Sequence, residues 1–280
     1  GNKTLLAQNV ESARKGNVFS NMLVAACYRN GIGVGKDAAK AVPFLTVAAE
    51  KDCLPAQREL ALILLNDKKA ADAAVWFKKG AQAGDMMCTF YYGKMLLEGL
   101  GVKPDKKDGA NYLLKAAEGG FPQAMYYVGN CYMTGDGLTK NAEQAVRWYK
   151  PAAGAGVANA QWALAQCYRE GNGTPVNYDL ATCWYAEAAA HGHARGFKNL
   201  ITDSIPASPY VAYLHGMKAY MDKDFDTALK QFKIVEKAKV ADGKVMEAAI
   251  FANSSYAGHN MKKGVKLLND AARTNAQAMY

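Results

Sequence analysis

The chain has 280 residues, of which 50% are hydrophobic, 21% charged and 10% aromatic. This composition excludes a wholly disordered chain, and 26 glycines without a three-residue period exclude a collagen-like one. Mean hydropathy is −0.19, and because no stretch of about 18 apolar residues occurs, no membrane-spanning helix is expected. The sequence therefore predicts a globular protein with room for about two ordinary domains.

The formal net charge is +9, divided into +5 on residues 1–209 and +4 on residues 210–280. The longest basic runs are pairs such as Lys68-Lys69. A nucleic-acid-binding protein usually gathers its positive charge on one face or tract. The even spread favours a solvated basic surface, and binding of nucleic acid or another polyanion is the alternative.

A repeat of 36 residues runs through residues 17–192 and joins, for example, Trp148 to Trp184. The step shortens to 32 residues between Phe44 and Trp76, where a four-residue deletion removes the glycine turn. Such a period is the sequence signature of a stacked repeat architecture. The five copies are residues 17–52, 53–84, 85–120, 121–156 and 157–192.

Each copy is predicted to form two helices joined by a turn, because apolar residues such as Val128 and Tyr132 recur at helical spacing. An Asp or Asn after the turn suits the N-cap of the second helix. A glycine at the end of four copies suits the left-handed position that follows a helix, and Asp52 takes that position in the first copy at more strain. The turn glycines are Gly31/Gly33, Gly99/Gly101, Gly135/Gly137 and Gly171/Gly173, the caps are Asp37, Asp105, Asn141 and Asn177, and the closing residues are Asp52, Gly84, Gly120, Gly156 and Gly192.

Small residues recur at one position of each helix, where they allow two helix axes to approach closely. One aromatic or bulky side chain per second helix is expected to fill the wider gaps. Because one helix pair cannot bury such faces alone, neighbouring copies must stack. The small residues are Ala25, Ala61, Gly93, Gly129 and Ala165 on first helices and Ala49, Ala81, Ala117, Ala153 and Ala189 on second helices; the aromatics are Phe44, Trp76, Tyr112, Trp148 and Trp184.

Partial copies are expected on both sides of the five complete ones. Residues 3–16 match the second helix of a truncated copy, from which we expect a longer parent protein. A further first helix is expected to begin near Gly196. That helix should stop at a proline-containing linker, residues 206–209, because proline disfavours helix at the preceding residue. We assign residues 1–205 to one repeat array.

Residues 210–280 follow a different pattern. Gly216, Asp224-Phe225, Ala228 and Phe232 fit the spacing G-x7-[DN]-[YF]-x2-A-x3-F, which resembles the tetratricopeptide repeat. We therefore expect tetratricopeptide-like helices in this part of the chain.

The array of residues 17–192 resembles the Sel-one-like repeat family, a branch of the tetratricopeptide superfamily. The shared pattern is A-x3-LG-x2-Y-x2-G-x-GV-x2-D-x3-A-x2-WY-x2-AA-x2-G. The resemblance implies an all-α fold, a right-handed α-solenoid of antiparallel helix pairs, with about fourteen helices in the chain. In the fourth copy the pattern reads Ala124, Val128-Gly129, Tyr132, Gly135, Gly137, Asn141, Ala145, Trp148-Tyr149, Ala152-Ala153 and Gly156.

Neither a catalytic residue, a metal site nor a cofactor is assigned. The glycine pairs follow helices rather than strands, so they are interpreted as turns and not as phosphate-binding loops. His191 and His193 flank the predicted turn at Gly192, which disfavours a shared metal. The six cysteines show neither CxxC nor zinc spacing; buried thiols are favoured, and a Cys167–Cys183 disulfide is the alternative.

The resemblance also implies that a non-core stripe of the first helices lines the concave face of the solenoid. Phe90, Tyr126 and Trp162 would form an aromatic ladder there, with burial as inter-repeat core as the alternative. We predict a non-enzymatic scaffold or adaptor that binds a protein or peptide segment, itself a monomer or weak dimer. The predicted groove residues are Arg58, Phe90, Lys94, Leu97, Tyr126, Asn130, Met133, Trp162, Gln166 and Arg169.

Overall fold

The computed structural model describes residues 2–193, 195, 209–237 and 242–278. These residues form fifteen α-helices, and the part of the chain so described contains no β-strand. Contacts divide the chain into two compact units, residues 1–151 and residues 152–280. The predicted helix start at Gly196 and residues 206–208 of the predicted linker lie outside the described residues, whereas Pro209 begins a helix.

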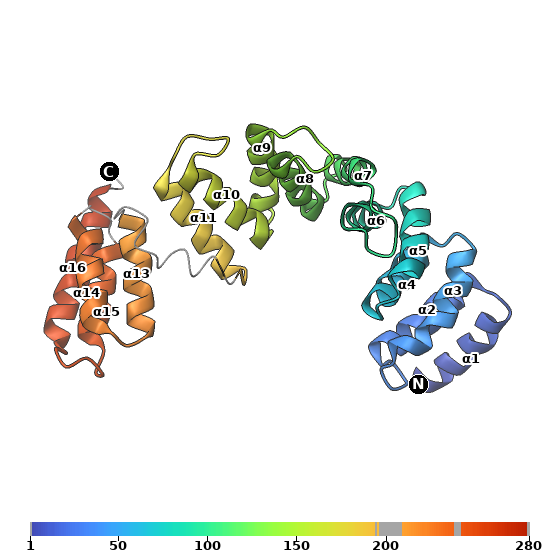
Figure 1. Ribbon diagram of the computed structural model, residues 1–280. Coiled ribbons are helices and arrows are strands. Elements are labelled where there is room, and N and C mark those ends of the chain that lie inside the picture. The colour runs from blue at the N-terminus through green and yellow to red at the C-terminus, as the bar shows by residue number, and fades with distance from the viewer. Residues whose placement is uncertain (1, 194, 196–208, 238–241, 279–280) are drawn as a thin grey trace. The chain divides into compact units, whose positions relative to one another are not determined.

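The first unit contains α1 to α8, in which each helix packs against the next, and most of α9 (Figure 1). The truncated copy expected at residues 3–16 is α1. No helix in the described ranges combines the length and apolarity needed to span a membrane. The bounds are α1 Asn2–Arg14, α2 Val18–Asn30, α3 Ala38–Glu50, α4 Leu54–Asn66, α5 Ala70–Gln82, α6 Met86–Glu98, α7 Lys106–Glu118, α8 Pro122–Thr134 and α9 Ala142–Gly154.

The second unit contains the end of α9, the fifth helix pair and the C-terminal helices. Within it α10 packs against α11, and α13 to α16 pack in consecutive order. The bounds are α10 Ala158–Glu170, α11 Tyr178–Ala190, α13 Pro209–Met221, α14 Phe225–Lys237, α15 Asp242–Ala252 and α16 Met261–Ala278.

The predicted N-caps of the second helices are confirmed. Each Asp or Asn side chain accepts a hydrogen bond from the backbone N–H three residues later, which satisfies one of the orphan amides at a helix start. Asn17 and Asp85 do the same for the first helices α2 and α6, which the sequence interpretation missed. The predicted pairs are Asp37 with Lys40 (3.2 Å), Asp105 with Asp108 (2.9 Å), Asn141 with Gln144 (3.0 Å) and Asn177 with Leu180 (2.9 Å).

The closing residues adopt the predicted left-handed conformation, with φ from +82° at Gly156 to +91° at Gly84. Asp52 takes the same conformation in the first copy at φ +58°. In the shortened second copy Lys68 provides the left-handed residue, at φ +62°. The short turn therefore replaces a glycine pair with one strained lysine.

The second glycine of a turn pair lies against the preceding copy. A Cβ on Gly101 would lie 2.4 Å from the carbonyl carbon of Ala70, and one on Gly137 would lie 2.0 Å from the carbonyl oxygen of Lys106. Ala70 and Lys106 begin the second helices α5 and α7. Each of these loops therefore touches the second helix of the copy before it, and only glycine fits there.

The deepest core position is the residue after the predicted aromatic. The predicted aromatics themselves are half-buried and pack at the edge of the core. Full burial of the next side chain places it between two neighbouring pairs, where it contributes most to stability. These residues, exposed by at most 2%, are Leu45, Phe77, Leu113, Tyr149 and Tyr185.

Buried amides join some copies to the second helix before them. Asn21 donates from Nδ2 to the Ala13 carbonyl at 3.0 Å, and Gln57 donates from Nε2 to Ala49 at 3.2 Å. Gln161 repeats this bond in the fifth copy. Each of these carbonyls, in the last turn of a helix, also accepts the backbone N–H of the closing residue three positions later, so the amide adds a second donor to it.

All six cysteines are free thiols. Burial raises the pKa of Cys88 to about 12 and the pKa values of Cys131 and Cys167 to about 11. These thiols behave as small apolar side chains of the core, which agrees with the favoured interpretation. The alternative Cys167–Cys183 disulfide is not formed in the structure.

The C-terminal helices have their own core, centred on Phe232 of α14. Asp224 caps α14 by accepting from the Thr227 N–H at 3.2 Å, and Gly216 lets α13 approach the Phe232 ring. Glu247 of α15 is buried in the same region. Three of the residues that define the tetratricopeptide-like pattern make these contacts: Gly216, Asp224 and Phe232.

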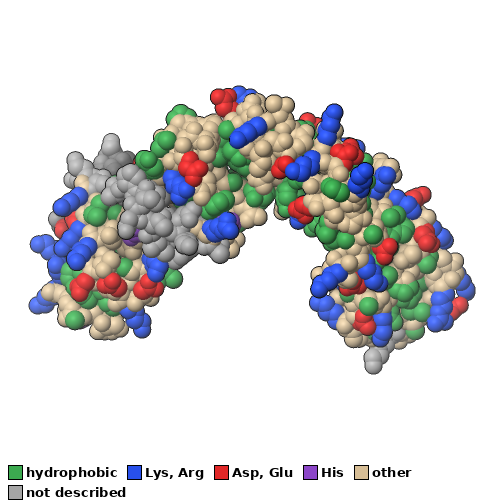
Figure 2. All heavy atoms as spheres, viewed as in Figure 1, with side chains coloured by type: hydrophobic (Ala, Val, Ile, Leu, Met, Phe, Trp, Pro, Cys, Tyr) green, Lys and Arg blue, Asp and Glu red, His purple; other side chains and the backbone are tan. Residues whose placement is uncertain are grey.

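Positive and negative side chains are interspersed on the surface. Figure 2 shows Lys and Arg side chains beside Asp and Glu side chains over the visible face of both units, without one continuous basic tract. Cross-repeat ion pairs such as Arg29–Glu59, at 2.7 Å, contribute to this mixing.

Gly137→Ala should destabilise the chain by about 2–4 kcal/mol, because the new Cβ meets the Lys106 carbonyl and φ is +75°. The midpoint of urea denaturation measures the effect. Gly120→Ala, with positive φ but open space around it, should cost only about 1 kcal/mol. Equal costs for the two variants would contradict the loop contact.

Stability of the C-terminal helices should fall as pH rises through about 7. Burial, the charge of Glu236 and a hydrogen bond with Glu236 raise the pKa of Glu247 from 4.5 to about 7, against the opposing charges of Lys233 and Lys263. The folded state therefore binds this proton more tightly than the unfolded state, and stability is greatest at pH values below 4.5 to 5 as far as this group is concerned.

Between pH 5 and pH 8 the loss should be about 1–3 kcal/mol, measured from NMR signals of α15 in urea. Glu247→Gln should remove most of this pH dependence and raise stability at pH 8. An unchanged pH dependence in that variant would assign it to other groups.

Candidate functional site

The ten predicted groove residues all lie on first helices, as the 36-residue step requires. They are called the first-helix stripe below. Seven lie on α4, α6 and α8 of the first unit and three on α10 of the second. By helix they are Arg58 on α4; Phe90, Lys94 and Leu97 on α6; Tyr126, Asn130 and Met133 on α8; and Trp162, Gln166 and Arg169 on α10.

Arg58 is a link between copies. Its Nη1 lies 2.8 Å from Oδ2 of Asp85, a carboxylate that is mostly buried. Asp85 also caps α6 by accepting from the Cys88 N–H at 2.8 Å. The guanidinium therefore holds the start of the next first helix, and its charge is partly compensated within the chain.

Phe90 is a core residue, exposed by only 6%. Its ring centroid lies 5.1 Å from that of Phe121 and 5.5 Å from that of Tyr127. Both neighbours belong to the next copy, and their rings cover the Phe90 side chain. Phe90 is therefore part of the inter-repeat core, the alternative stated for it above. Only Tyr126 and Trp162 remain of the predicted aromatic ladder.

Tyr126 and Asn130 remain half-exposed on α8. The Tyr126 ring lies 5.4 Å from Tyr127 and 6.1 Å from Tyr149. The Tyr149 hydroxyl donates to Oδ1 of Asn130 at 2.7 Å. Because this bond fixes the amide by its oxygen, the Asn130 Nδ2 group is oriented as a donor for an outside acceptor.

Lys94 lies one copy earlier, with its ammonium 5.4 Å from the centroid of the Tyr127 ring and 3.9 Å from Oε1 of Glu98. Burial lowers its pKa, but the hydrogen bond with the Tyr127 hydroxyl and the nearby charges outweigh burial, so the pKa is raised. Lys94 is therefore a cation with its ammonium held near the aromatic rings. Half-buried Leu97 and Met133 lie about one turn further along each helix.

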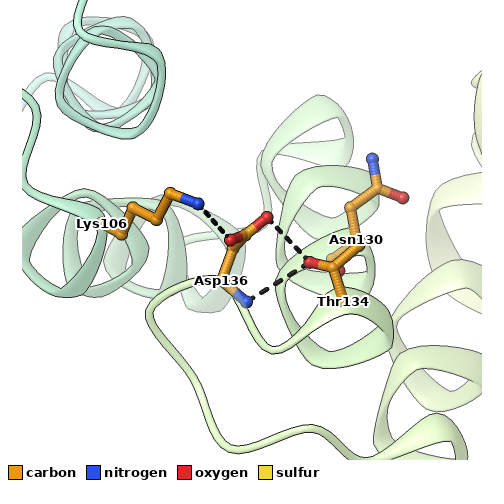
Figure 3. Close-up of polar contacts among 4 residues, drawn as sticks. All are labelled: Lys106, Asn130, Thr134 and Asp136. Atoms are coloured by element: carbon orange, nitrogen blue, oxygen red, sulfur yellow. Dashed lines mark hydrogen bonds and ion pairs between the residues drawn. The ribbon is translucent and has the colours of Figure 1, made fainter.

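The end of α8 is fixed by a polar contact between copies. Figure 3 shows Asp136, at the centre of a glycine turn, between Lys106 of the preceding copy and Thr134. The Asn130 carbonyl oxygen, 3.0 Å from the Thr134 hydroxyl, is the alternative acceptor for the single hydrogen of that hydroxyl. Hydrogen bonds from Lys106 and Thr134 lower the pKa of Asp136. This contact ties the helix that carries Tyr126 and Asn130 to the rest of its unit.

The second unit carries the other part of the stripe. The Trp162 ring stacks on His193 at 5.3 Å, and the Arg195 guanidinium lies 6.0 Å from it. Burial and the Arg195 charge lower the pKa of His193. The Trp162 Nε1 and the Gln166 Oε1 are buried and make no hydrogen bond.

Arg169 lies within 2.6 Å of Glu170, so its charge is partly compensated locally. The two histidines make different contacts: His191 Nδ1 lies 2.9 Å from the Glu187 carbonyl oxygen, and His193 stacks on Trp162. Among the described residues, no group of three or more potential metal ligands comes together.

The sequence interpretation missed Tyr127, Tyr149 and His193 as neighbours of the stripe. Tyr127 follows Tyr91 by 36 residues, so the repeat step itself could have identified that position. His193 lies after the last complete copy and has no such counterpart. Its stacking on Trp162 could not be derived from spacing.

Comparison with known proteins agrees with the helix-pair architecture. A family model described as Sel1 repeat matches residues 18–53, 54–85, 87–121, 122–157 and 158–193. A search of curated proteins gives no match.

Two solved structures share the fold. A Sel1 repeat protein from Oxalobacter formigenes is 28% identical to this chain with a TM-score of 0.62. The match covers 74% of this chain and 89% of the Oxalobacter protein. A protective antigen of uropathogenic Escherichia coli with an SLR fold is 22% identical with a TM-score of 0.62, covering 96% of this chain. This chain spans 64% of the length of the E. coli protein. The five matched repeats cover more than half of the sequence, and the chain belongs to the Sel1 repeat family.

Proposed function

We propose that the chain is a non-enzymatic adaptor that holds a segment of a partner protein on its first-helix stripe. Proteins built from Sel1 repeats are generally non-catalytic scaffolds for protein interactions. We propose in addition that this particular chain binds a peptide in a groove and has no catalytic activity of its own. The partner, on this proposal, is a protein or peptide rather than a small molecule.

The observation that carries the proposal is the arrangement on α6 and α8. Tyr126 offers a half-exposed ring, Asn130 offers an amide donor fixed by Tyr149, and Lys94 offers a cation. An aromatic anchor gives large contact area at low entropy cost, and the two donors suit carbonyl or carboxylate oxygens. The expected partner segment is therefore extended and rich in acidic residues.

The α10 part of the stripe would act as a second anchor. Trp162 offers a large ring and an indole N–H without an acceptor, and Gln166 offers a carbonyl oxygen without a donor. A peptide group has both complements, so binding there would pair two buried polar atoms. Arg169 lies one turn further along the same helix.

Nucleic-acid binding is the alternative function, and the net charge of +9 is its only support. Neutralising several phosphates would make binding fall steeply with salt. The mixed surface charges support the protein partner over this alternative.

Tyr126→Ala and Trp162→Ala should each weaken partner binding by about 2 kcal/mol, the usual size of a hot-spot effect. Short random peptides displayed on phage and selected on the intact chain supply the ligands, which should be enriched in Asp and Glu. Affinities are then measured by calorimetry at two salt concentrations. Phe19→Ala, on an exposed ring outside the stripe, is the matched control and should bind normally.

Melting temperatures separate binding from folding. If Trp162→Ala lowers stability by about 3–5 kcal/mol, as truncation of a core Trp does, the ring belongs to the core and not to the groove. Selected peptides that bind the Lys94→Ala, Tyr126→Ala and Asn130→Ala variants as tightly as the parent chain would place the binding surface elsewhere.

A further inference from the structure

A second concave site lies on the other side of α10, outside the first-helix stripe. It is a pocket of roughly 480 Å³ between the end of α9, the start of α10 and the second half of α11. All of its lining residues belong to the second unit. They are Ala153, Gly154, Ala155, Gly156, Gln161, Trp184, Glu187 and His191.

Gln161 gives the pocket a buried acceptor. Its side chain is exposed by only 2%, and its Nε2 donates to the Ala153 carbonyl at 3.1 Å. The amide oxygen Oε1 is buried and makes no hydrogen bond. A buried acceptor without a donor costs stability, so a ligand that supplies an N–H or charged donor gains from pairing it.

The other walls of the pocket are also negative or electron-rich. The last turn of α9 presents the negative end of a helix dipole. Glu187 contributes a carboxylate, and Trp184 contributes an aromatic ring. His191 Nδ1 lies 2.9 Å from the Glu187 carbonyl oxygen, so in the neutral ring Nδ1 carries the proton and Nε2 is an acceptor. Carboxylate, amide oxygen, imidazole nitrogen and ring face together suit a cation.

The second copy places a cation over the corresponding aromatic ring, although the Oε1 atom of Gln57 makes no hydrogen bond there. Gln57 and Trp76 correspond to Gln161 and Trp184 in the repeat register, and Gln57 makes the equivalent bond to Ala49 at 3.2 Å. The counterpart of Glu187 there is Lys79, whose ammonium lies 4.5 Å from the centroid of the Trp76 ring.

The first copy also places a lysine ammonium on the corresponding surface, but from a different repeat position. Lys51 corresponds to His191 in the register, and its ammonium donates to the Gly16 carbonyl at 2.5 Å. Gly16 in turn corresponds to Gly156 of the pocket. Two copies therefore place a lysine ammonium on part of the corresponding surface, over the aromatic ring in the second copy and on a carbonyl in the first. The fifth copy has a carboxylate and an imidazole at these two lysine positions.

We propose that the pocket of the fifth copy binds an alkylammonium group, such as the end of a lysine side chain of a bound protein. The ammonium would take the place that Lys79 and Lys51 occupy in their own copies. It would lie against the Trp184 ring and pair with Glu187 and with Oε1 of Gln161. This site is independent of the first-helix stripe, so either can exist without the other.

The test is an NMR titration of the full-length, ¹⁵N-labelled chain with Nα-acetyl-lysine methylamide. The Trp184 indole N–H and the Gln161 side-chain amide are observed, and the indole signal is assigned with Trp184→Phe. Both signals should shift and saturate. The neutral analogue Nα-acetyl-norleucine methylamide should leave them unchanged, and equal shifts with this analogue would overturn the proposal.

Glu187→Lys is the decisive variant, because it recreates the arrangement of Lys79 and Trp76 and should fill the pocket from within. We expect at least about a tenfold rise in Kd for the lysine probe. Glu118→Lys makes the same charge change at an exposed position outside the pocket and should leave Kd unchanged. A normal titration of the Glu187→Lys variant would overturn the proposal.

If circular dichroism shows that Glu187→Lys does not fold, Glu187→Gln takes its place and should raise Kd by about threefold; an unchanged Kd would again overturn the proposal. Two further probes separate the sources of the ammonium group. Tighter binding of the peptide Ala-Lys-Ala than of butylamine assigns the pocket to a protein lysine, whereas equal binding assigns it to small free amines.

Discussion

The close contact between a glycine turn and the preceding second helix is the constraint on which the stacking depends. Gly101 lies against the start of α5 and Gly137 against the start of α7, at distances that leave no room for a side chain. Such a contact fixes the position of one helix pair relative to the preceding pair. Once that position is fixed, the residue after each aromatic falls between two pairs and is buried. Leu45 is fully buried at the one such junction that has no glycine turn, so the backbone contact acts together with apolar packing in setting the depth of the core.

Most of the fold could be predicted because the sequence repeats its local signals. A capping Asp or Asn, a closing glycine and a small residue recur at fixed places, and each acts within a few residues of itself. Asp52 illustrates this, since its left-handed conformation was expected from its place alone and is found at φ +58°. The helices of residues 210–278 likewise use Gly216 and Asp224 as their pattern indicates.

The site was less predictable, because its residues are decided by contacts between copies. Phe90 and Tyr126 occupy the same repeat position, yet Phe121 and Tyr127 bury the first. Tyr126 packs against Tyr127 and Tyr149 and is only partly buried. The Arg58 guanidinium is paired with the carboxylate of Asp85, 27 residues further along the chain. Spacing identifies which residues share a face, but the side chains of the next copy determine which of them stay accessible.

The shortened turn of the second copy has a consequence for the order in which the chain opens. Residues 67–69 connect α4 to α5 without a glycine pair, so no loop of this kind reaches back to the start of α3. Helices α1 to α3 therefore lack the loop-to-helix contact that Gly101 and Gly137 make in the following copies, and the packing of α3 on α4 holds them to the array. In a stacked array, a junction that lacks one such contact is where the array is expected to open first. The N-terminal three helices would then form their own foldon, exchanging amide hydrogens by partial opening while the later copies stay closed.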